Sequence, residues 1–137
     1  MGFWGVKSYE NDLAHDALDT GFDQIHGSRY VELMDDRNPL PYEKVHETLA
    51  GQETLEASLK ALEQMISENP DDEGDDPGLA WVGIVVRHAE CKVKMDDQIL
   101  RKAMELLQSE DLDWPRPTER KLRIDREMNL LKSQLSN

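Results

Sequence analysis

The chain has 137 residues and a formal net charge of −13, with 38% hydrophobic and 33% charged residues, so one domain over residues 1–137 is expected and nucleic-acid binding is disfavoured. The single cysteine, Cys91, excludes an internal disulfide. Because the chain has neither a secretory-type start nor an apolar run of the roughly 18 residues that span a membrane, we expect no membrane insertion and a cytoplasmic location.

Residues 1–9 precede any helical periodicity, and we expect an extended lead-in with buried aromatic side chains. A helix is predicted from about Asn11 to His26, with Ser8 or Asn11 as its N-cap and Gly27 as its stop. One face of this helix is apolar. That face carries Leu13, Ala14, Ala17, Leu18, Gly21 and Ile25, with Phe22 at its border. The opposite face is acidic, and we expect it to form an exposed interaction surface of Asp12, Asp16, Asp19 and Asp23.

Residues 28–36 predict a short helix or a turn, and two prolines, Pro39 and Pro41, then break the chain. From Tyr42 to Glu68, apolar residues recur at steps of three and four, which predicts helix. Gly51 leaves open whether this is one helix or two, and Thr54 is the expected cap of a second one. A coiled-coil seam would show the same stripe, but a single short run favours one helix of a bundle.

Residues 69–78 hold five acids, two prolines and two glycines, which predicts a solvated acidic loop. The next segment, from Leu79 to about Val93, begins with residues that are apolar nearly all round, as in a helix at the centre of a bundle. Val82 to Val86 also fits a buried strand. Helix is favoured because no other segment offers a strand to pair with it.

Asp96 is the predicted cap of the next helix, and Thr118 the predicted cap of the last one. We expect the basic residues of the last helix on its wet side, attracted to the acidic helices at 11–26 or 42–68. They are Arg120, Lys121, Arg123, Arg126 and Lys132. A nucleic-acid-binding arm is the alternative, but three acids among these bases argue against it. The elements together predict an all-α compact bundle of about five helices.

The first twenty residues resemble a known family. Met1-Gly2-Phe3-Trp4-Gly5 is followed by the run Asn11-Asp-Leu-Ala-His-Asp16. Chains of the uncharacterised, mostly bacterial, domain-of-unknown-function family 4259 tend to open with Met-Gly-x-Trp-Gly, then an aromatic residue and Asn-Asp-x-Ala-x-Asp. Tyr9 stands near the aromatic position, and Lys7 replaces an expected glycine. The resemblance implies a small helical protein and no particular activity. We interpret Gly2, Trp4, Gly5 and Asn11 as a structural motif.

Carboxylate and imidazole groups recur one helical turn apart, as in the Glu-x-x-His motifs of metal-binding helical bundles. The candidate metal ligands are Asp12, His15, Asp16, Glu43, His46 and Glu47. Because the carboxylates at 12 and 16 are predicted to face water, a metal ion bound there is the alternative hypothesis rather than the leading one. No other cofactor is expected. The acidic loop does not have the register of a calcium-binding EF-hand loop.

His88 and Cys91 share one face of a predicted helix, which is the spacing of a base and a nucleophile, but without a third group a hydrogen-bonded core histidine and a buried thiol are favoured. The catalytic residues therefore stay unknown.

The acidic and basic side chains are unevenly distributed along the chain. Residues 1–77 hold 19 acidic and 5 basic side chains, whereas residues 115–137 hold 3 acidic and 6 basic ones. This bias favours a non-enzymatic interaction module with a basic protein partner, of the inhibitor or immunity type. A metal-binding bundle or an enzyme is the alternative, and the oligomeric state is open.

Overall fold

The structure, a computed structural model, describes residues 7–9, 12–35, 37, 41–68, 77–110 and 116–135. Asp12, Tyr42 and Glu43 are described by their backbone alone. This part of the chain contains seven helices and no strand, which confirms the all-α class. The helices are α1 (Asp12–His26), α2 (Ser28–Leu33), α3 (Tyr42–Leu49), α4 (Gln52–Glu68), α5 (Pro77–Glu90), α6 (Asp97–Gln108) and α7 (Pro117–Gln134).

The expected number of about five helices is too low for two reasons. The segment after Gly27 forms the separate helix α2, and the segment from 42 to 68 divides in two because Ala50 adopts an extended backbone with ψ 140°. Thr54 is not the N-cap of α4. It lies in the first turn, where its hydroxyl accepts a hydrogen bond from the Gly51 N–H (2.8 Å) and so satisfies a donor that the helix leaves free.

Helix α1 packs closely on α4 through its predicted apolar face. Ala14, Ala17, Leu18 and Phe22 are fully buried there, whereas Ile25 at the end of the helix is 38% exposed. The two backbones meet at Gly21. A Cβ at that position would lie 2.6 Å from the backbone nitrogen of Ser58, so only glycine permits this approach.

Helix α5 is the central element, and α1, α4, α6 and α7 all pack against it. Residues 82–89 are buried, and the helical backbone at Val82–Val86 excludes the alternative of a strand. The predicted acidic loop extends too far, because Pro77 and Gly78 already belong to α5, whose first turn tolerates a proline. Residues 69–76 lie outside the described residues. The helix ends at Glu90, before a left-handed Lys92 (φ 65°).

Helix α6 begins as predicted, because the Asp96 carboxylate accepts a hydrogen bond from the Gln98 N–H (2.8 Å). The prediction for α7 is wrong in its start and its packing. The helix starts at Pro117, so Thr118 lies inside it and does not cap it. Its main packing partners are α5 and α6 rather than the acidic helices α1 and α4. None of the described helices is long and apolar enough to cross a membrane.

Candidate functional site

His46 is a core residue in this fold. Its ring is fully buried and stacks on Phe22, with 4.3 Å between the ring centroids. Burial, followed by the nearby charge of Arg87, lowers the pKa of His46 to about 3, so the ring is neutral. The Arg87 Nε–H donates to His46 Nδ1 (3.1 Å), which places the ring hydrogen on Nε2. The neighbouring Glu47 is exposed, so this carboxylate and imidazole do not share one surface.

His88 is the hydrogen-bonded core histidine that the sequence predicts. Its Nδ1 lies 2.8 Å from the carbonyl oxygen of Ile84, which can only accept, so Nδ1 carries the hydrogen. Burial lowers the pKa of His88 to about 4, and the other nitrogen of the neutral ring accepts from the Thr54 hydroxyl (3.0 Å). Burial also raises the pKa of Cys91 to about 11, so its sulfur is a thiol at neutral pH and a poor nucleophile.

The residues of the metal hypothesis are placed only in part. His15 is half-buried and Asp16 exposed on α1, while the side chains of Asp12 and Glu43 lie outside the described residues. Within the described residues, no group of three or more His, Cys, Asp or Glu side chains lies close enough to hold a metal ion. The metal site therefore stays a prediction.

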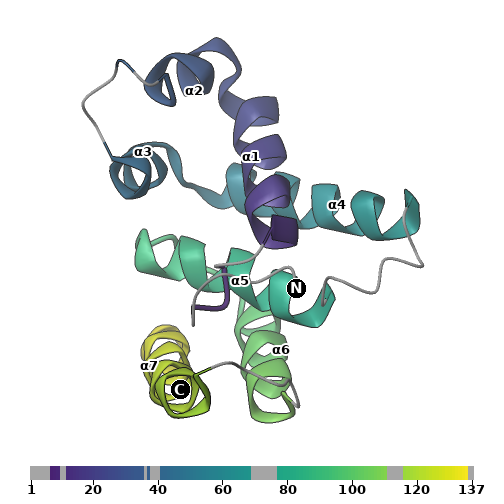
Figure 1. Ribbon diagram of the computed structural model, residues 1–137, viewed down its shortest axis with the longest axis vertical. Helices are drawn as coiled ribbons and strands as arrows, with labels where there is room; N and C mark the ends of the chain where they lie inside the picture. The colour runs from purple at the N-terminus through teal and green to yellow at the C-terminus, as the bar shows by residue number, and fades with distance from the viewer. Residues whose placement is uncertain are drawn as a thin grey trace.

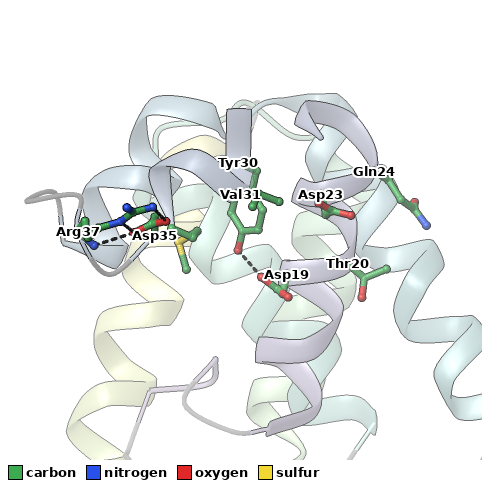
Figure 2. Close-up of a pocket in the computed structure, with 9 residues that line it drawn as sticks. Asp19, Thr20, Asp23, Gln24, Tyr30, Val31, Asp35 and Arg37 are labelled. Atoms are coloured by element: carbon green, nitrogen blue, oxygen red, sulfur yellow. Dashed lines mark hydrogen bonds and ion pairs between the residues drawn. The ribbon is translucent and has the colours of Figure 1, made fainter. Parts of the chain in front are cut away.

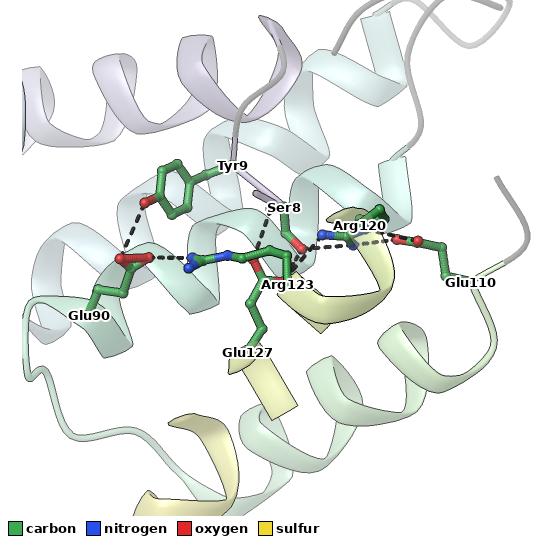
Figure 3. A network of polar contacts seen from close by, with 7 residues as sticks. All are labelled: Ser8, Tyr9, Glu90, Glu110, Arg120, Arg123 and Glu127. Atoms are coloured by element: carbon green, nitrogen blue, oxygen red, sulfur yellow. Dashed lines mark hydrogen bonds and ion pairs between the residues drawn. The ribbon is translucent and has the colours of Figure 1, made fainter. Parts of the chain in front are cut away.

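A buried charge network holds residues 8 and 9 against the helices (Figure 3). The Ser8 N–H donates to Glu127 Oε2 (3.0 Å), and the Ser8 hydroxyl also donates to the Glu127 carboxylate. Arg120 donates to the Ser8 hydroxyl oxygen (3.0 Å) and to Glu110 (3.0 Å). Ser8 thus bonds to α7, and its role as the N-cap of α1 stays a prediction. The prediction that Arg120 lies on the wet side is wrong: it is 2% exposed, because residues 8 and 9 cover that side of α7.

The same network continues to α5. Arg123 donates to Glu127 (2.9 Å) and to Glu90 (2.8 Å), so this arginine is also not on a wet face. The Tyr9 hydroxyl donates to Glu90 (3.2 Å), and burial with this carboxylate raises the pKa of Tyr9. A Cβ at Gly83 would lie 2.4 Å from the Ser8 carbonyl oxygen, which shows how closely the segment crosses α5. These charges are paired inside the fold, which indicates a structural role.

A groove with a volume of about 830 Å³ opens between α1 and α2 (Figure 2). Its lining residues are Asp19, Thr20, Asp23, Gln24, Tyr30, Val31, Met34, Asp35 and Arg37. Helix α2 turns back beside α1 because Gly27 takes a φ of 54°, which favours glycine. The Tyr30 hydroxyl then donates to Asp19 Oδ1 (2.7 Å) and fixes one wall against the other.

The groove combines negative charge with an exposed apolar surface. Three carboxylates line it against one guanidinium, and that guanidinium, on Arg37, is already paired with Asp35 at 3.0 Å. The pairing lowers the pKa of Asp35, so this carboxylate is ionised at neutral pH. Val31 is 61% exposed in the same groove. The site therefore offers hydrogen-bond acceptors beside an apolar surface, which suits a lysine or arginine side chain with its aliphatic stem.

The predicted acidic surface maps partly onto this groove. Asp16, Asp19 and Asp23 are exposed as expected, and the last two line the groove, whereas the side chain of Asp12 lies outside the described residues. Val31 and Asp35 were missed, since their place beside α1 depends on how the chain turns at Gly27. The pattern offers no signal for this wall, because Tyr30, Leu33 and Met34 lie in the same segment and nothing marks Val31 as the exposed residue.

Comparisons with family models, with curated proteins and with solved structures give no significant match. The resemblance to family 4259 therefore stays a prediction. Its motif residues Gly2, Trp4, Gly5 and Asn11 lie outside the described residues.

Proposed function

We propose that the protein is a non-enzymatic interaction module that binds a basic segment of another protein in the groove between α1 and α2. The observation that carries this proposal is the exposed Val31 in a groove that is also lined by Asp19 and Asp23 of α1 and by Asp35, just after the end of α2. A basic side chain can place its apolar stem on Val31 and Met34 and its charged end on Asp19 or Asp23.

The charge of the whole chain supports the same partner chemistry. A net charge of −13 attracts a basic protein from a distance and raises the association rate, and salt weakens this attraction. A protein that covers the basic active site of an enzyme, as an inhibitor or immunity protein does, has this chemistry. We include that role in the proposal as its most specific form.

The groove is tested by titrating the protein with a labelled amphipathic peptide that carries lysine and leucine at helical spacing. We expect saturable binding that weakens with salt, and no binding of the same peptide with glutamate in place of lysine. The double variant Asp19→Asn and Asp23→Asn should raise the Kd at least about tenfold, equivalent to about 1.4 kcal/mol.

The matched control removes two exposed charges from α4 instead, with Glu56→Gln and Glu63→Gln. This control removes the same number of negative charges as the groove variant. It should therefore change the Kd by less than about twofold if the groove is the site. Equal losses in the two double variants would show that only the overall charge attracts the peptide, and the groove proposal would then be wrong.

A further inference from the structure

We propose that the groove between α1 and α2 also receives the exposed face of α7 from a second copy of this chain, so that molecules associate head to tail. This inference rests on the proposed function, because it uses the same groove and the same chemistry. It adds an occupant that the chain itself supplies.

Two exposed apolar side chains define the two halves of the contact. Val31 in the groove is 61% exposed, and Leu122 on α7 is 62% exposed, whereas Ile25, the other large hydrophobic residue exposed in the described part, is 38% exposed. A leucine that is largely exposed on a helix gains from any apolar surface that removes it from water. The groove, with Val31 and Met34 in its lining, is such a surface.

The charges beside these two side chains are of opposite sign. Lys121 is exposed directly before Leu122, and Arg126 is exposed one turn after it. Lys132 is exposed further along α7. Asp125 is an exposed acid on the same stretch, and Glu119 is already paired with Arg116 at 3.1 Å. The exposed residues from 116 to 132 thus carry four bases and two acids, so this surface is net basic, which complements the acidic groove.

The arrangement of the helices excludes a contact within one molecule. Helices α1 and α2 lie at one end of the long axis, and α7 lies at the other end, beyond α5 (Figure 1). A molecule therefore cannot fill its own groove with its own α7. The contact joins two different surfaces, so each pair keeps one free groove and one free α7, and further copies can add.

The net charge of −13 opposes this association at long range but not at contact. At physiological ionic strength the Debye length is about 8 Å, which screens the acidic ends of two molecules from each other. The facing charges of α7 and the groove lie closer than that. Because one helix face covers less area than a standard interface, we expect a Kd between about 10 μM and about 1 mM.

The test uses two single variants, Val31→Asp and Leu122→Asp, studied by analytical ultracentrifugation of the full chain near physiological salt. The wild type should form dimers and larger species as its concentration rises. Each variant alone should be monomeric, because one half of the contact is lost. Their equimolar mixture should form a one-to-one dimer that grows no further, since one intact groove and one intact α7 face remain.

Gln64→Asp on the exposed face of α4 is the control, and it should associate as the wild type does. A monomeric wild type, a mixture that does not pair, or a single variant that still dimerises would each overturn the head-to-tail contact. Leu122→Asp keeps its groove, so its binding of the lysine–leucine peptide tests the proposed function separately. Peptide binding by this variant beside a monomeric wild type would leave the proposed function standing and this inference wrong.

Discussion

Arg120 is the largest of the fully buried side chains in the described part of the chain. It bonds to Ser8 and Glu110 and lies 3.6 Å from Glu127. Replacing it by methionine keeps much of the volume but removes this cation from two carboxylates inside the fold, of which Glu127 keeps its bond to Arg123. We expect Arg120→Met to lower the free energy of unfolding by about 3–5 kcal/mol, measured by urea denaturation.

The exposed Arg126 on the same helix is the matched control. Arg126→Met should change the free energy of unfolding by no more than about 0.5 kcal/mol. An Arg120→Met variant as stable as the wild type would show that the buried charges contribute no net stability.

The two core histidines give the fold a sensitivity to acid. The pKa of His46 falls from 6.5 to about 3 and that of His88 from 6.5 to about 4. Between these values the unfolded chain binds protons that the folded chain does not, so the free energy of unfolding falls as the pH drops below about 6.5. Each histidine contributes a slope of up to about 1.4 kcal/mol per pH unit.

His46→Gln separates the two contributions, because glutamine does not titrate and can still accept a hydrogen bond from Arg87. We expect this variant to lose about half of the pH dependence that the two histidines give to the free energy of unfolding below pH 6.5. Denaturation at a series of pH values measures this loss. Equal slopes for the variant and the wild type would exclude His46 as a source.

At the scale of elements, the contact between α1 and α4 depends on one glycine. Helix propensity alone would make Gly21→Ala stabilising by about 1 kcal/mol. The new Cβ would, however, lie 2.6 Å from the backbone nitrogen of Ser58 and 2.7 Å from its Cα, so the helices must separate. We expect a net loss of about 1–3 kcal/mol in thermal or urea unfolding.

Ser58→Ala serves as the comparison for this variant. The Ser58 hydroxyl is buried without a hydrogen-bond partner among the described residues, so its removal should cost little or stabilise the fold. Adding Ser58→Ala to Gly21→Ala should not restore stability, because backbone atoms cause the clash. Full restoration would show that the hydroxyl alone was the obstacle.

The elements also show which features of the fold follow from local patterns. Apolar residues at steps of three and four predict the helical class and the inner face of α1. Asp96 can be identified as a cap from the sequence because its hydrogen-bond partner, the Gln98 N–H, is only two residues away. The burial of Arg120 could not be predicted, because Ser8, 112 positions away, covers it. Likewise, Asp19 and Asp23 were predicted to be exposed, but the opposite wall of the groove follows from the turn at Gly27.

For the whole molecule, the uneven charge predicts how salt acts on stability. Residues 1–77 carry 19 acids and 5 bases, and mutual repulsion of their exposed acids opposes the compact state. Salt screens this repulsion, since the Debye length falls from about 30 Å at 0.01 M to about 3 Å at 1 M. The pairs of Arg120 with Glu110 and Glu127 are buried and are screened much less.

We therefore expect the Tm, followed by circular dichroism, to rise by roughly 3–6 °C over this salt range, which corresponds to about 1 kcal/mol. Glu63→Lys reverses an exposed charge on α4 and should raise the Tm at low salt but not at high salt, because salt removes the same repulsion. A Tm that falls with salt would mean that attraction between surface charges outweighs repulsion. The surface charges would then raise the free energy of unfolding rather than lower it. A basic partner would not be needed to relieve repulsion between the acids.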